Sequence, residues 1–236
     1  MTKSSEPGHD TLADDVLGFG VRELVTTRDV VVRPRTVLEA WMTRGADGGG
    51  HYARPLRLYL ALNAILMLIL FLQGGAGFLL DAMPAEQLNE HVARSGKSVD
   101  AFRADADGWM TLVMVPLLSV FYAVASAPLF RLWDKENLGW RRGFRAAFAW
   151  LSAWTVPVIA LSWWAYDPGP TQIIFSIAIV LLGAVAFVRM GRGRWFESMP
   201  IGIGKAVILT VAVQISAAIG GALVVAIGLW GASVTS

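Results

Sequence analysis

The sequence contains no cysteine and is poor in charged residues. Only 16% of its 236 residues are charged, whereas a soluble domain usually carries about 25%. The absence of cysteine excludes disulfides, thiolate zinc sites, iron–sulfur clusters, cysteine nucleophiles and lipid anchors attached through a thiol. Because 55% of the residues are hydrophobic, a single water-facing globule could not bury them all. The composition therefore predicts a membrane protein.

Motifs for catalysis and for metal or nucleotide binding are also missing. The three histidines, His9, His51 and His91, lie far apart in polar segments, and neither His-x-Glu nor His-Glu-x-x-His spacing occurs. The sequence has no Gly-x-Ser-x-Gly motif and no glycine-rich loop followed by Lys-Ser or Lys-Thr. We therefore expect a protein that is not an enzyme and that holds no cofactor and no metal. A net charge of +2 does not indicate a nucleic-acid-binding surface.

Five long apolar segments dominate the rest of the chain. A helix needs about 20 apolar residues to cross roughly 30 Å of hydrocarbon, and each of these segments is close to that length without an ionisable residue in its core. The expected spans are residues 58–80, 109–130, 148–166, 171–188 and 206–230. The sequence thus predicts an all-α polytopic membrane helix bundle with about five transmembrane helices over residues 56–236.

Lysine and arginine gather in alternate connections between these spans. From the N-terminus onward, the six segments outside the spans carry eight, three, five, zero, four and zero basic residues. Cytoplasmic loops carry an excess of Lys and Arg, so we expect a cytoplasmic N-terminus and an outside C-terminus in a bacterial inner (cytoplasmic) membrane. Residues 1–7 lack the apolar core of a cleavable signal peptide, and we expect the first span to direct insertion.

Residues 1–55 form a polar segment with two amphipathic patterns. Apolar residues recur at helical spacing over residues 11–27 and again over residues 36–42, and a glycine-rich stretch at residues 45–50 follows. Two interpretations of residues 11–42 remain open. These helices lie on the membrane surface, or they pack on the loops as a small cytosolic cap. The amphipathic pattern favours the first interpretation.

Few polar side chains fall inside the spans, and Asn63 and Gln214 stand out. One interpretation is a polar site within the bundle for a substrate or a lipid headgroup. The other is interhelical hydrogen bonding, worth about 1 kcal/mol or less. The second is favoured because no charged residue accompanies either amide, and transport sites usually contain one.

The fifth span contains small residues at a spacing that allows close helix packing. They are Ser216, Ala217, Gly220 and Gly221. Such a face lets two helix backbones approach each other. The neighbour is either another span of this chain or a second copy in a homo-oligomer, and the sequence leaves both open.

Four arginines near the membrane surface are candidates for contact with lipid headgroups or with a protein partner. They are Arg141, Arg142, Arg192 and Arg194. The leading functional hypothesis is a non-enzymatic scaffold or interaction protein of the membrane that binds anionic headgroups or a protein partner. The alternative is a small-solute or lipid transporter or channel that uses the polar residues Asn63 and Gln214.

Residues 27–34 and 52–60 resemble a bacterial membrane family of uncharacterised function known as DUF3667. In that family a short helix leads through a glycine-rich turn to an Arg- and Pro-containing entry into the first span, as Arg54-Pro55-Leu56 does here. Many members carry a cysteine-based zinc ribbon upstream, which this cysteine-free chain lacks. The five-span plan is also similar to that of Yip1-type membrane proteins. Neither resemblance implies catalytic residues.

Overall fold

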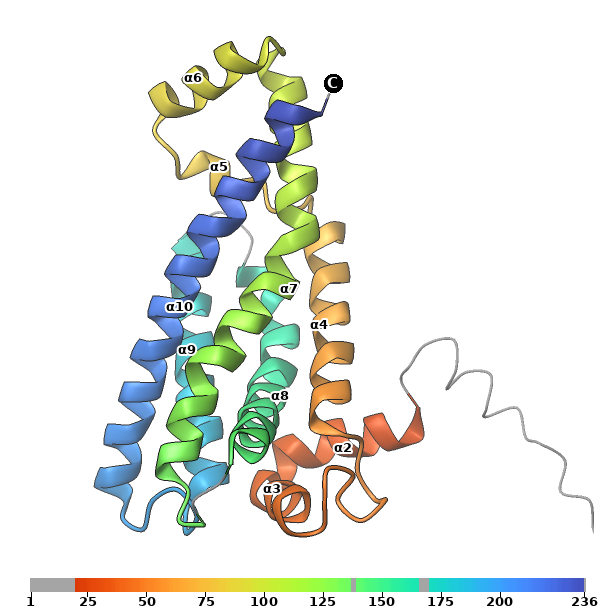
Figure 1. The fold of residues 1–236 in the computed structure, drawn as a ribbon, viewed down its shortest axis with the longest axis vertical. Helices are drawn as coiled ribbons and strands as arrows, with labels where there is room; N and C mark the ends of the chain where they lie inside the picture. Colours follow the sequence, from red (N-terminus) through yellow and green to blue (C-terminus); the bar gives the residue numbers. More distant parts are fainter. Residues whose placement is uncertain (1–19, 137–138, 166–169, 236) are drawn as a thin grey trace, which may run out of the picture.

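The computed structural model describes residues 20–136, 139–165 and 170–235. Within them the protein is all-α, and five helices are long and apolar enough to cross a membrane, which confirms the predicted fold class (Figure 1). These helices are α4 (Pro55–Leu72), α7 (Val99–Trp133), α8 (Trp140–Ala165), α9 (Pro170–Gly191) and α10 (Met199–Val234). The chain is a multi-pass membrane protein.

The five long helices run alternately up and down, so the bundle has two distinct ends (Figure 1). We call the end where α4 begins the basic end, because every described Lys and Arg lies near it except Arg94, Lys97 and Arg103. Helices α2 (Val21–Val32) and α3 (Pro34–Thr43) lie at the basic end.

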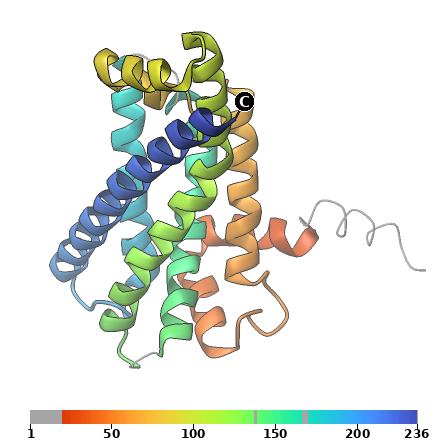
Figure 2. The ribbon, with the colours of Figure 1, turned by 45° about the horizontal axis from the view of Figure 1, so that its top comes forward.

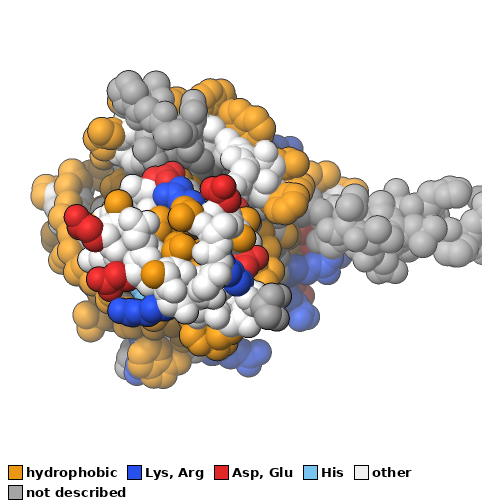
Figure 3. All heavy atoms as spheres, turned by 90° about the horizontal axis from the view of Figure 1, so that it is seen from above, with side chains coloured by type: hydrophobic (Ala, Val, Ile, Leu, Met, Phe, Trp, Pro, Cys, Tyr) orange, Lys and Arg blue, Asp and Glu red, His pale blue; other side chains and the backbone are white. Residues whose placement is uncertain are grey.

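The opposite end of the bundle carries the C-terminus and two short helices, α5 (Phe78–Asp81) and α6 (Ala85–Ser95). Seen from this end, acidic and basic side chains occupy the end surface and hydrophobic side chains surround it (Figure 3). The long helices also expose large hydrophobic side chains along their outer faces, such as Phe71 at 70% and Ile173 at 66%. A helix bundle that spans a membrane needs apolar outer faces in the hydrocarbon and polar surfaces at its two ends.

Helices α7 and α10 form the most extensive helix pair, and α10 lies obliquely along α7 (Figures 1 and 2). Glycines on α10 allow this approach. A methyl group added at Gly228 would collide with Met110, and one added at Gly231 would collide with Trp109. Dispersion between closely approaching backbones is the main attraction available to helices in lipid, so these glycines set the distance between α7 and α10.

Helices α8 and α10 begin eight and seven residues before their predicted spans 148–166 and 206–230. Two further differences lie near the opposite end. Helix α4 ends at Leu72 rather than near residue 80, because Gly74 and Gly75 adopt positive φ angles of 95° and 89° and turn the chain into α5. Helix α7 begins at Val99, ten residues before the predicted span, and Ser98 caps it by accepting a hydrogen bond from the Ala101 amide.

Candidate functional site

Helix α2 lies across the basic end (Figure 1). It turns a polar face towards the bundle. Glu23, Thr26 and Asp29 are buried on this face. The Thr26 hydroxyl accepts a hydrogen bond from the Ala53 amide at 2.9 Å, and Glu23 forms an ion pair of 2.9 Å with Arg57. These bonds fix α2 to the segment that leads into α4.

The outward face of α2 is largely hydrophobic. Val21, Leu24 and Val32 are exposed by 69%, 58% and 58%, although each would be more stable away from water. Helix α2 lies at the level where α4 begins (Figure 1), and an apolar face at that level suits the headgroup and acyl-chain boundary. Residues 20–32 thus combine both of the open interpretations, since one face packs on the protein and the other is free for lipid. Residues 11–19 lie outside the described residues.

Helix α3 packs into the basic end instead of lying on its surface. Trp41 is completely buried, and its indole Nε1 donates a hydrogen bond of 3.0 Å to the Ala53 carbonyl. Arg145 of α8 donates a hydrogen bond of 2.9 Å to the Trp41 carbonyl. For residues 34–43 the structure therefore favours the cap interpretation.

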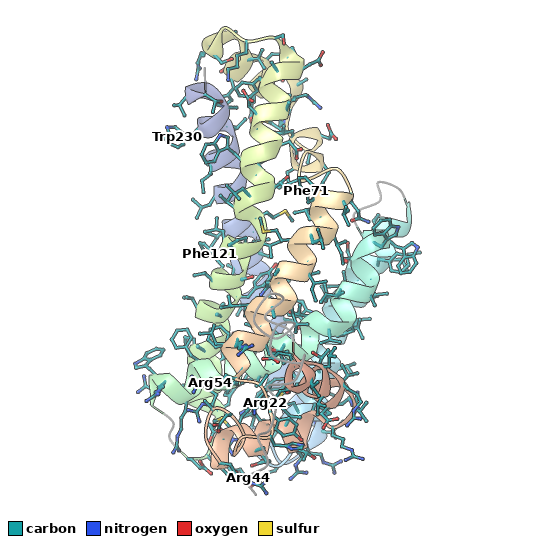
Figure 4. The ribbon with its side chains drawn as sticks, turned by 90° about the vertical axis from the view of Figure 1, so that its right-hand side faces the viewer. Arg22, Arg44, Arg54, Phe71, Phe121 and Trp230 are labelled. Atoms are coloured by element: carbon teal, nitrogen blue, oxygen red, sulfur yellow. The ribbon has the colours of Figure 1, made fainter. Side chains whose placement is uncertain are left out.

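A cavity of about 710 Å³ opens between α2, the loop before α4 and the first turns of α4. We call it the basic pocket. Its lining residues are Arg22, Glu23, Asp47, Tyr52, Ala53, Arg54, Leu56, Arg57 and Leu60. Figure 4 shows Arg22 and Arg54 beside the lower end of α4, with Arg44 farther from the bundle.

The described lining of the basic pocket has three arginines and two carboxylates, so it carries one net positive charge. Glu23 forms an ion pair with Arg57 and accepts a hydrogen bond from the Gly20 amide. Asp47 accepts a hydrogen bond from the Gly49 amide at 3.2 Å. Within the described ranges, the side chains of Arg22 and Arg54 have no carboxylate partner. In the part of the chain that the structure describes, these two guanidinium groups are therefore available to an anion.

Tyr52 lines the basic pocket as an uncharged residue. Burial, and then the neighbouring Asp29 carboxylate, raise the pKa of the Tyr52 phenol above its ordinary value. The phenol therefore stays protonated at neutral pH, and it donates a long hydrogen bond of 3.5 Å to Asp29.

A second cavity, of about 450 Å³, lies between α4, α7 and α8 and is almost entirely apolar. We call it the α4–α7 groove. Leu56 and Leu60 line both this groove and the basic pocket, so the two cavities meet at these side chains. The groove exists because α4 packs mainly on α8 and much less on α7.

Asn63 lines both this groove and a smaller cavity of about 160 Å³. Tyr59 and Ser119 line the same two cavities. The Asn63 amide donates a hydrogen bond of 2.9 Å to the Tyr59 carbonyl, within α4 itself. Gln214, by contrast, is exposed on α10 and lines neither cavity. The two amides that stood out in the sequence therefore do not form one site.

Three of the four arginines proposed for headgroup contact are accessible. Arg141, Arg142 and Arg192 are exposed at the basic end. Arg142 lies 3.7 Å from Glu136, which is a weak surface ion pair. These positions are compatible with contact to lipid or to a partner.

Arg194 differs from the prediction because its side chain is only 7% exposed. It donates a bidentate pair of hydrogen bonds to Asp134, at 2.7 Å and 3.3 Å, and further bonds to Glu136 at 3.1 Å and Glu39 at 3.3 Å. We call these four residues the Arg194 cluster. Burial lowers the pKa of Arg194, but the Asp134 hydrogen bond and the surrounding carboxylates raise it more. Arg194 is thus an internal ion-pair residue and not a headgroup contact.

The four small residues singled out on α10 differ in their burial. Gly220 is buried against Leu118 of α7, with only 2.8 Å between that side chain and an added methyl group, whereas Gly221 faces open space. Ser216 and Ala217 are half-buried. The sequence interpretation missed Gly228 and Gly231, which the small-xxx-small spacing around residue 217 does not include.

Acidic and histidine side chains do not gather into a metal site within the part of the chain that the structure describes. No protein-family model, no curated protein and no solved structure matches this chain. The resemblance to DUF3667 and to Yip1-type proteins therefore stays a prediction. The fold defines the class, a multi-pass membrane protein with five candidate spans, and the cavities at its basic end are the basis for a proposal about function.

Proposed function

We propose that this protein binds anionic lipid headgroups in the basic pocket, and that it acts as a non-enzymatic scaffold or interaction protein of the membrane. In this proposal the basic end faces the cytoplasm of a bacterial cell, and the membrane is the inner membrane. The observation that carries the proposal is the pair Arg22 and Arg54, which have no carboxylate partner among the described residues and lie where α4 enters the bundle.

The chemistry of the basic pocket suits a phosphate group. A guanidinium presents a planar fork of donors that matches phosphate oxygens, and basic pockets at the cytoplasmic side of membrane helices bind lipid headgroups. The outward hydrophobic face of α2, with Leu24 exposed by 58%, would hold the pocket at the level of the headgroups. Exposed Arg141, Arg142 and Arg192 at the same end add long-range attraction to an anionic surface.

The double substitution Arg22→Gln with Arg54→Gln should weaken binding of phosphatidylglycerol. Each basic residue at an anionic surface contributes about 1 kcal/mol, so the loss of two should lower the affinity roughly 30-fold. The measurement is the rise in the thermal unfolding midpoint of the purified protein when phosphatidylglycerol is added, with phosphatidylcholine as the neutral reference. Binding stabilises the folded state by mass action, so the variant should lose most of the rise.

The matched control is the double substitution Arg35→Gln with Arg44→Gln, which removes the same charge from exposed positions that do not line the basic pocket. This control should keep most of the response to phosphatidylglycerol. An equal response in both double variants would mean that the pocket has no particular role, and the proposal would be abandoned.

A lipid or solute transporter is the second candidate, and the cavity of about 160 Å³ beside Asn63 favours it. Tyr59, Ser119 and Thr155 provide hydroxyl groups around this space. Faster movement of fluorescent phosphatidylglycerol across vesicles that contain the protein, abolished by Asn63→Leu, would favour transport over the scaffold proposal.

A further inference from the structure

The α4–α7 groove continues from the basic pocket towards the middle of the bundle. Along α4 its lining residues extend from Leu56 to Met67, a distance of about 16 Å at the rise of an α-helix. One leaflet of the hydrocarbon core is half of roughly 30 Å, or about 15 Å. The length of the groove along α4 therefore matches the depth of a single leaflet, and the groove begins beside the basic pocket.

The two cavities have opposite chemistry and share an edge. Arg22 and Arg54 make the pocket cationic, whereas the groove is walled almost entirely by apolar side chains. Leu56 and Leu60, exposed by 47% and 56%, form the boundary between them. A charged site that adjoins an apolar groove matches an amphiphile whose anionic head is followed by a hydrocarbon chain.

We propose that the groove holds one acyl chain of the lipid whose phosphate lies between Arg22 and Arg54. The ligand is then an anionic glycerophospholipid of the same leaflet, with one chain in the groove and the other in the surrounding bilayer. This inference rests on the proposed function, because it names the ligand of the same site. A soluble phosphate would occupy only the pocket, and an apolar partner helix would occupy only the groove.

The two parts of the site have different energetic roles. In a bilayer the acyl chain moves from lipid to an equally apolar protein wall, so the hydrophobic effect gives little net affinity. The arginines supply the affinity, and the groove adds dispersion contacts that an annular lipid lacks and orders one chain. Blocking the groove should therefore shorten the time for which the lipid stays bound, without removing the attraction for anionic surfaces.

The test uses Ala64→Trp, which places a large side chain in the groove from an exposed position on α4. The matched control is Ala222→Trp, which adds the same side chain at an exposed position on α10. The probe is phosphatidylglycerol that carries a photoreactive group midway along one acyl chain. The readouts are the fraction of purified protein that retains the lipid, by native mass spectrometry, and the positions of the crosslinks.

We expect crosslinks on α4 and α7 around Asn63 and Ser119, and retention that falls roughly five-fold or more in Ala64→Trp but not in Ala222→Trp. Val120→Trp, from an exposed position on the opposite wall, replaces Ala64→Trp if the latter does not fold.

The remaining outcomes separate this inference from the proposed function. Retention that depends on Arg22 and Arg54 but not on the groove, with crosslinks spread over α9 and α10, would overturn the acyl-chain site and leave the headgroup site standing. Loss of retention in the groove variant but not in the arginine double variant would overturn the headgroup site and, with it, this inference. Retention that none of the variants changes would overturn both.

Discussion

Replacing Arg194 with glutamine should destabilise the protein by about 3–5 kcal/mol, the usual result of removing one member of a buried ion pair. The Asp134 side chain is completely buried, and its two oxygens accept hydrogen bonds from Arg194 at 2.7 Å and 3.3 Å. Without the guanidinium, a buried carboxylate is left without a counter-charge. Glu39 of α3 loses its ion pair with Arg194 as well, so the contact between α3 and the α9–α10 connection should also weaken.

The measurement is the unfolding free energy of the purified protein in detergent. Arg192→Gln is the matched control, because Arg192 is an exposed arginine two residues away in the same connection. Substitution at such a surface position usually changes stability by less than about 0.5 kcal/mol. Equal stability of the two variants would contradict the internal role assigned to Arg194 and restore a surface role for it.

The substitution Trp195→Ala should cost about 3–5 kcal/mol, as expected for truncating a fully buried large aromatic side chain. Trp195 is 1% exposed, and its ring centroid lies 4.4 Å from that of Phe130 and 5.3 Å from that of Phe187. Among the described residues its indole Nε1 has no hydrogen-bond partner. The loss is therefore one of packing and not of a hydrogen bond.

Trp230→Ala provides the comparison for this second prediction, since Trp230 is 63% exposed on α10 (Figure 4). Its removal should alter the unfolding midpoint in detergent much less than Trp195→Ala does. If both tryptophan variants unfold at the same temperature, the packing of Trp195 against Phe130 and Phe187 does not contribute to stability as described.

The five spans could be predicted because few backbone structures are stable in the hydrocarbon of a membrane. Uncharged apolar runs of this length have few other stable states, and the structure confirms an all-α bundle with five such helices. Their ends were less predictable. The first apolar run continues to Leu80, but Gly74 and Gly75 turn the chain after Leu72. A hydrophobic pattern does not show where the backbone changes direction.

The candidate site could be predicted only in part, because its geometry depends on contacts between distant segments. Arg194 appears in the sequence as part of a basic turn, and its partner Asp134 is 60 residues away. The inward polar face of α2 could have been predicted from the sequence, because Glu23, Thr26 and Asp29 recur every three residues. The meeting of the basic pocket and the α4–α7 groove follows from the way α4 packs on α8, and no local pattern in the sequence encodes it.

The most direct test of the account is the position of the two ends of the bundle relative to the membrane. The chain has no cysteine, so single substitutions give unambiguous labelling sites. Thr36→Cys lies exposed on α3 at the basic end, and Ala93→Cys lies exposed on α6 at the opposite end. In intact bacterial cells a membrane-impermeant thiol reagent should label Ala93→Cys and should reach Thr36→Cys only after the cells are broken. Labelling of both sites in intact cells, or of Thr36→Cys alone, would contradict a five-span protein with its basic end in the cytoplasm.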